Sequence, residues 1–137
     1  MATTYFQNGY MTFFKNLAQN NSSNWFNENR RTYENEVKIP FNEFIEHIIS
    51  LINKDGENIE IKAADTIFRI NRDIRFSKDK TPYKLHMSAN ISTMGKKNKT
   101  YPGLYLQVSP EEIMIGGGAY ELEKDEINKI RNYILNN

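Results

Sequence analysis

The chain has 137 residues, of which 39% are hydrophobic and 26% charged, and its formal net charge at pH 7 is +1. This composition is typical of a globular protein, and the length predicts one domain over residues 1–137. The absence of cysteine excludes disulfides and cysteine-ligated metals, and the two histidines lie too far apart in sequence to suggest a histidine-rich metal site. With no leader and no membrane-spanning run, we expect a cytoplasmic protein with no cofactor, metal or membrane partner.

Apolar residues recurring every three or four positions predict helices in the first third of the chain. A first stripe covers residues 11–17, and Ser22 or Ser23 can cap a second helix whose buried line runs from Trp25 to Val37. Pro40 either kinks this helix or opens a third. The stripe that follows Pro40 ends near Gly56, a residue suited to a left-handed helix stop.

After Gly56 the apolar residues alternate with polar ones, which predicts β-strands. We expect strands within 59–64, 66–76, 84–92, 103–109 and 112–117, with a hairpin turn at "SPEE" and an exposed loop at "KKNK". The connections are too short for crossover helices, so the sheet should be mainly antiparallel. A last helix, 123–135, should bury Ile127, Ile130 and Ile134. The expected fold class is therefore α+β, with N-terminal helices packed on a mainly antiparallel sheet and a C-terminal helix.

Residues 69–86, "RINRDIRFSKDKTPYKLH", are the most basic stretch of the chain. Six Lys or Arg against two Asp give this stretch a charge of +4, so the remainder of the chain sums to −3. On one strand face Arg69 and Arg75 would offer guanidinium forks to a carboxylate or phosphate, with Asp73 between them. Arg72 falls on the apolar face, where it needs a ligand or an internal ion pair. A solvated polar face is the equally ordinary alternative.

The turn that follows adds further candidates. Lys78 and Lys80 would meet an anion or remain solvated, and Tyr83 would stack on a ligand or pack in the core. Lys84 and His86 share the next strand face, and His86 is a candidate general acid or base oriented by Asp73. A polar surface histidine without a catalytic part is the alternative reading of His86.

The glycine run "IGGGAY" is the second stretch of interest. Gly116, Gly117 and Gly118 directly follow a predicted strand and precede a helix, so free backbone donors there could cradle an anion. Such a run also occurs where a strand bends or another backbone passes close. Its spacing fits neither the Walker nor the dinucleotide-binding motif.

Several of these stretches occur together in one known family. "NNSSNWF", "YENEVKIPF", "RDIRFSKDKTPYKLH", "GLYLQVSPEE", "IGGG" and "INKIRNYI" follow one another in an order that resembles domain-of-unknown-function family 2461, an uncharacterised family of bacteria and fungi. The resemblance spans nearly the whole chain. It implies that the signature is the segment Arg72–Lys84 together with His86, and that Gly116–Gly118 match a second signature position.

The chain departs from this family in two respects. Family members look longer, with a further strand-rich stretch after the last helix, which implies a truncated chain or a short member that lacks part of its sheet. Leu122 stands where a proline is expected, which leaves the start of the last helix in doubt. Because the family looks uncharacterised, the resemblance implies a fold and a site but no activity.

Three functions fit these observations. The first is binding of a small phosphate- or carboxylate-bearing ligand by the basic stretch and the glycine run, with or without catalysis by His86 and Asp73. The second is a structural or interaction module in which an Arg–Asp–Lys network holds the turn to the sheet. The third is binding of single-stranded nucleic acid, with Tyr83 and Tyr101 as stacking groups, which the near-neutral total charge disfavours.

Overall fold

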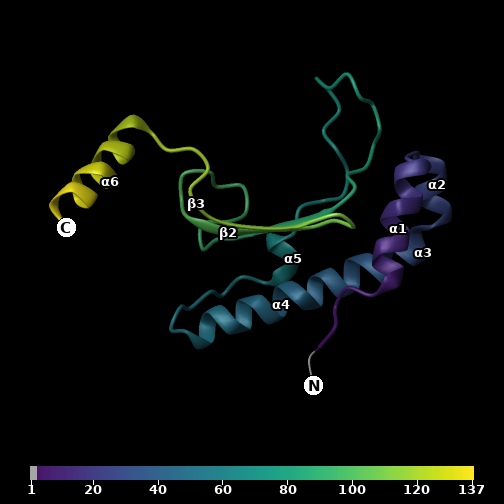
Figure 1. Ribbon diagram of the computed structural model, residues 1–137, viewed down its shortest axis with the longest axis horizontal. Helices are drawn as coiled ribbons and strands as arrows, with labels where there is room; N and C mark the ends of the chain where they lie inside the picture. The colour runs from purple at the N-terminus through teal and green to yellow at the C-terminus, as the bar shows by residue number, and fades with distance from the viewer. Residues whose placement is uncertain (1–2) are drawn as a thin grey trace.

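The computed structural model describes residues 3–137, with helices in the first half of the chain and a sheet in the second. The helices are α1 (Asn8–Gln19), α2 (Ser23–Glu28), α3 (Arg30–Tyr33), η1 (Glu34–Lys38, a π-helical turn), α4 (Ile39–Lys54), α5 (Ala63–Thr66) and α6 (Lys124–Asn136). The strands are β1 (Met87–Ile91), β2 (Gly103–Val108) and β3 (Ile113–Gly118). This architecture, drawn in Figure 1, confirms the predicted α+β class.

Local sequence signals set the helix boundaries in the N-terminal half. The Ser22 hydroxyl accepts a hydrogen bond from the Trp25 amide at 3.3 Å, so this serine caps α2. Pro40 stands in the first turn of α4, directly after η1, whose wider turn leaves room for the proline ring. Gly56 follows α4 with a φ of 103°, the left-handed conformation predicted for this helix stop.

The helices bury an aromatic core against the sheet. Phe13, Phe26 and Tyr33 contact one another in the helical layer, with ring centroids 5.0–6.2 Å apart. Tyr10 is fully buried, and its hydroxyl donates a hydrogen bond of 2.9 Å to the carbonyl oxygen of Val108. This bond ties α1 to β2, and burial raises the pKa of Tyr10 well above its ordinary value.

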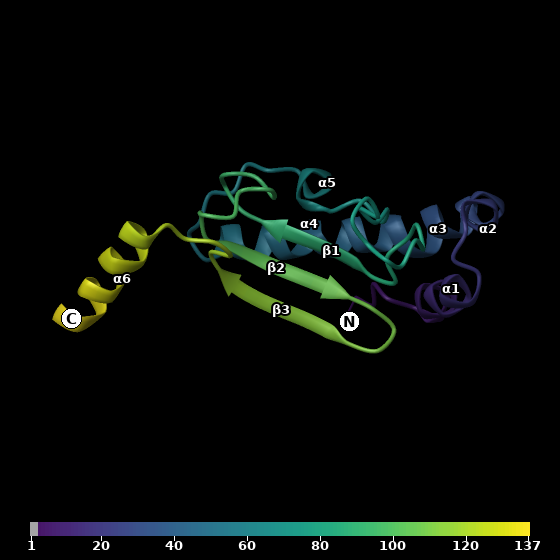
Figure 2. The same ribbon diagram turned by 90° about the horizontal axis from the view of Figure 1, so that it is seen from above.

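The sheet is antiparallel, in the order β1–β2–β3, with the predicted hairpin turn between β2 and β3. Ala89 lies opposite Leu106, and Leu106 lies opposite Ile115. Residues directly opposite one another on neighbouring strands point to the same side of a sheet, so these three residues share one face. The N-terminal helices cover that face over β1 and β2, where α4 runs along the sheet in both views (Figures 1 and 2).

The strands predicted at 59–64 and 66–76 are wrong. Residues Ala63–Thr66 form α5. The segment after it pairs at isolated bridges, Ile67–Ala89 and Asn71–Tyr83, and through backbone hydrogen bonds beside them, such as that from the Phe68 N–H to the Ser88 carbonyl at 2.9 Å. The alternating pattern placed Phe76 on a buried face, whereas its side chain is 96% exposed. Beyond the Asn71–Tyr83 bridge, side chains take up the backbone groups of Thr81: Arg72 donates to its carbonyl, and Asp79 accepts from its N–H, so the pairing does not continue as a strand ladder.

The far edge of the sheet and the last helix are not covered. All six residues of β3 are exposed, including Ile113 and Ile115 on the face that the helices cover elsewhere. Helix α6 extends away from the rest of the structure (Figure 1), and none of its residues is buried. The predicted burial of Ile127, Ile130 and Ile134 is therefore wrong, because the linker before α6 leads the helix away from the sheet.

Candidate functional site

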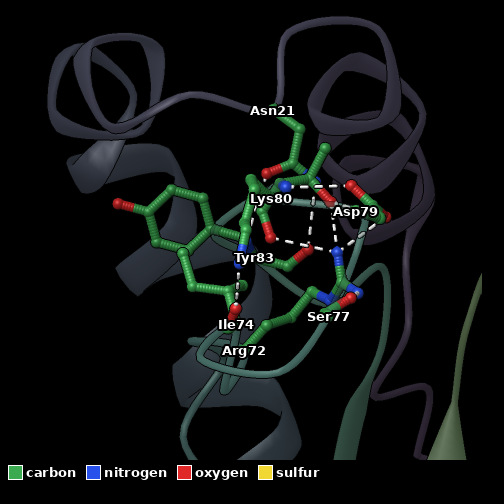
Figure 3. A network of polar contacts seen from close by, with 8 residues as sticks. Asn21, Arg72, Ile74, Ser77, Asp79, Lys80 and Tyr83 are labelled. Atoms are coloured by element: carbon green, nitrogen blue, oxygen red, sulfur yellow. Dashed lines mark hydrogen bonds and ion pairs between the residues drawn. The ribbon is translucent and has the colours of Figure 1, made fainter.

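The predicted site residues of the basic stretch lie mostly on one projecting loop, residues 72–81, here called the arm (Figure 1, teal). Arg72 braces its base. Its guanidinium donates to the Asp79 carboxylate at 2.7 Å, to the Thr81 carbonyl at 3.0 Å and to the Thr81 hydroxyl. Figure 3 shows Arg72 and Asp79 turned toward each other. A further contact reaches the Ser77 hydroxyl at 3.5 Å. The guanidinium of Arg72 thus directs all four of these contacts to groups of the arm.

Arg75 is also paired. Its Nε and Nη2 donate to the two carboxylate oxygens of Asp73 at 3.0 and 2.7 Å, a bidentate geometry. This pairing lowers the pKa of Asp73 to about 2 and raises the pKa of Arg75. Lys80 donates to the Ile74 carbonyl at 2.8 Å (Figure 3), whereas Lys78 is exposed. The arm therefore folds its charges largely onto itself.

Tyr83, predicted as a ligand-binding or stacking residue, is a core residue. Its side chain is buried and stacks on Phe26, with centroids 4.2 Å apart and an interplanar angle of 16°. The Asn21 amide holds the Tyr83 backbone from both sides, donating to its carbonyl at 3.0 Å and accepting from its N–H at 3.1 Å. These contacts anchor the residues that follow the arm to α2 and to the turn before it, and they make Tyr83 unavailable for stacking on a base.

The predicted pair of His86 and Asp73 is not formed as expected. Asp73 lies in the arm, turned toward Arg75, and no strand places it beside His86. His86 precedes β1 and is half-buried, and burial and the nearby Lys84 lower its pKa, opposed by Glu112. Lys84 donates to the Arg69 carbonyl at 3.0 Å, and burial and Arg69 lower its pKa. The acid–base assignment for His86 and Asp73 therefore lacks the geometry that it requires.

The glycine run also differs from the prediction. Gly116, Gly117 and Gly118 belong to β3 and pair with Tyr105, Leu104 and Gly103 of β2, so they form no free loop. The arm joins the sheet next to Met87, which pairs with Val108 at the opposite end from Gly118. The two predicted halves of the anion site are therefore at opposite ends of the sheet (Figure 2).

The glycines instead form the floor of a pocket, here called the glycine pocket, on the face opposite the helices. The register aligns Asn90, Tyr105 and Gly116 in one row across the three strands. A Cβ atom at Gly116 would meet nothing within 4 Å, so the space above this floor is open. The pocket has a volume of about 850 Å³, which is large enough for a small organic molecule.

The walls of the glycine pocket are aromatic and basic. Phe68, Tyr101 and Tyr120 provide rings, and the loop after β1 provides Lys96, Lys97 and Lys99. Lys96 donates to the Ile67 carbonyl at 2.7 Å, and Lys99 pairs with Glu121 at 3.1 Å beside the Tyr120 ring. The lining residues include no Asp or Glu, so the only formally charged side chains that line the pocket are lysines. From the sequence we expected only an exposed loop here, although its lysine run beside Tyr101 already placed positive charge next to an aromatic ring.

Two negative findings concern the described part of the chain. Within residues 3–137, no group of three or more His, Asp or Glu side chains is placed to hold a metal ion. Over the same residues, no helix combines the length and apolar character that crossing a bilayer requires.

The fold and site define an α+β protein with a helical layer on one face of its antiparallel sheet and an open, lysine-rimmed pocket on the other. The chain belongs to the family described as conserved hypothetical protein (DUF2461), whose family model matches residues 9–137. This match confirms the resemblance carried by the arm and the glycine run. No curated protein and no solved structure matches the chain.

Proposed function

We propose that the protein binds a small molecule that carries a flat ring and a phosphate or carboxylate group in the glycine pocket. The observation that carries this proposal is the gathering of three lysines and several aromatic rings over a glycine floor. A flat ring can lie against the floor because Gly116 has no side chain, and the tyrosines can stack at its edges. The ammonium group of Lys97 would meet the anionic group as a mobile point charge, and Lys99, which is paired with Glu121, would add to the basic rim.

This proposal keeps the ligand class predicted from sequence and moves it from the arm to the opposite end of the sheet. Arg72 and Arg75 are satisfied by partners of their own, so binding an anion there would require breaking those contacts. Lys97 is exposed, and within residues 3–137 it forms no ion pair. Lys97 therefore offers positive charge at the glycine pocket without that reorganisation, whereas Lys96 and Lys99 are engaged by the Ile67 carbonyl and by Glu121.

The test is isothermal titration calorimetry with mononucleotides, aromatic carboxylates, sugar phosphates and a short single-stranded oligonucleotide. Gly116→Val should fill the floor and reduce affinity at least tenfold, while its unfolding midpoint stays unchanged because the added side chain meets open space. Lys97→Gln should weaken binding several-fold, and Lys78→Gln, on the arm, is the matched control that should not. Equal binding by Gly116→Val and wild type, or binding to none of the compounds, would overturn the proposal. Preferential binding of the oligonucleotide, lost in salt, would replace it with nucleic-acid recognition.

A further inference from the structure

A second cavity, here called the helix cleft, lies between the helical layer and residues 67–71. It has a volume of about 820 Å³ and is distinct from the glycine pocket, although Phe68 and Lys96 line both. One wall comes from α3, η1 and α4 and the other from the segment that precedes the arm. Between them lie the apolar side chains of Tyr33, Ile70 and Met87, all buried in the core.

The two walls of the helix cleft differ in charge. The α4 wall presents Glu43 and Glu46, both exposed, the facing side presents Arg69 and Lys96, and Arg30 of α3 lines the cleft over the Phe26 ring. Glu34 and Lys38 also line the cleft but pair with each other at 3.1 Å along the same wall. Within residues 3–137, none of the ion pairs joins one wall to the other. The carboxylates and the guanidinium thus face a shared space without neutralising each other.

The backbone of the helical wall is irregular at this position. Glu34 and Lys38 are the first and last residues of η1, and both line the cleft. A π-helical turn is less stable than the α-helix that it interrupts, and such turns occur frequently at functional sites. This second observation, independent of the charges, points to the same cleft.

We propose that the helix cleft binds a small zwitterion that carries an ammonium group at one end and a carboxylate at the other. The ammonium group would lie against Glu43 and Glu46, and the carboxylate would accept two parallel hydrogen bonds from the Arg69 guanidinium. The apolar floor would contact the part of the ligand between its charges. A short peptide with free termini and a long-chain ω-amino acid share this chemistry.

Titration calorimetry with defined probes tests this proposal. Trialanine and 6-aminohexanoic acid represent the two sources, and N-acetyl-trialanine and trialanine amide each lack one of the two charges. We expect at least one zwitterion to bind, and removal of either charge to weaken binding about tenfold or more. Tighter binding of trialanine would identify a peptide as the ligand, and tighter binding of 6-aminohexanoic acid would identify an ω-amino acid.

Charge-neutral variants locate the site. Glu43→Gln should abolish the preference for trialanine over its acetylated form, and Arg69→Gln should abolish the preference over the amide. Glu57→Gln and Arg31→Gln remove exposed charges that do not line the cleft, so they should leave both preferences unchanged. Absence of binding by both zwitterions, or equal binding of charged and blocked peptides, would overturn the proposal. Gly116→Val should not change zwitterion binding, which separates this site from the glycine pocket.

Discussion

Arg72 should stabilise the arm rather than bind a ligand. The substitution Arg72→Ala removes the hydrogen bonds to the Thr81 carbonyl and hydroxyl at the base of the arm. These bonds come from a charged donor in a half-buried site, so we assign about 1 kcal/mol to each, or about 2 kcal/mol in all. The exposed partner Asp79 adds little, because salt and water screen an ion pair at the surface.

Urea denaturation measures this loss as a lower unfolding midpoint with an unchanged slope. Arg75→Ala is the matched control, because its bonds run only to the neighbouring, exposed Asp73, and its midpoint should stay near that of wild type. The arm of Arg72→Ala should also become more sensitive to limited proteolysis between residues 73 and 80. Equal midpoints for Arg72→Ala and Arg75→Ala, with unchanged proteolysis, would refute the assignment of Arg72 as a brace.

Two further predictions concern the same region. Asn21→Ala should lower the free energy of unfolding by about 2 kcal/mol in urea, because it leaves the backbone N–H and carbonyl of Tyr83 without their partner; a loss as small as that of a surface substitution would contradict this role. The pKa of His86 is lower in the folded state than its ordinary 6.5, so the unfolded chain binds the proton more tightly and stability should fall as the pH drops below about 6.5. His86→Gln should flatten this fall between pH of about 7 and 5, measured by urea midpoints across that range, and an unchanged pH dependence would show that His86 does not cause it.

The sequence was sufficient for the parts of the fold where local signals agree with tertiary packing. Ser22, Pro40 and Gly56 marked helix boundaries, and the "SPEE" turn joined two strands whose alternation was real. The alternation in 66–76 was equally regular and yet misleading. Arg72 and Asp79 take up hydrogen-bonding groups that a strand ladder would need, and their pairing depends on how the turn closes. Sequence spacing alone does not specify that closure.

The sequence predicted the kinds of residues that form the candidate site better than it predicted their position in the fold. Positive charge beside glycines and tyrosines does occur, but the glycines meet Lys96 and Lys99 instead of the arm. Their proximity depends on the β2–β3 register and on the path of the loop after β1, neither of which appears in a linear pattern. The basic stretch drew attention because six charges stood together, whereas the pocket gathers its residues from four separate segments.

The π-helical turn has a consequence for how the longest helical segment uses its surface. From Tyr33 to Ile49 every fourth residue is buried: Tyr33, Val37, Phe41, Ile45 and Ile49. Four residues of α-helix rotate about 40° beyond a full turn, so four such steps would carry a straight stripe about 160° around the helix. The wider turn at η1 absorbs part of this rotation, and the remainder lets the segment face α1 near its start and α5 and β1 further along. The helical segment thus changes partners along its length, and lengthening or shortening η1 by one residue would rotate α4 by about 100° and turn its buried stripe away from α5 and β1.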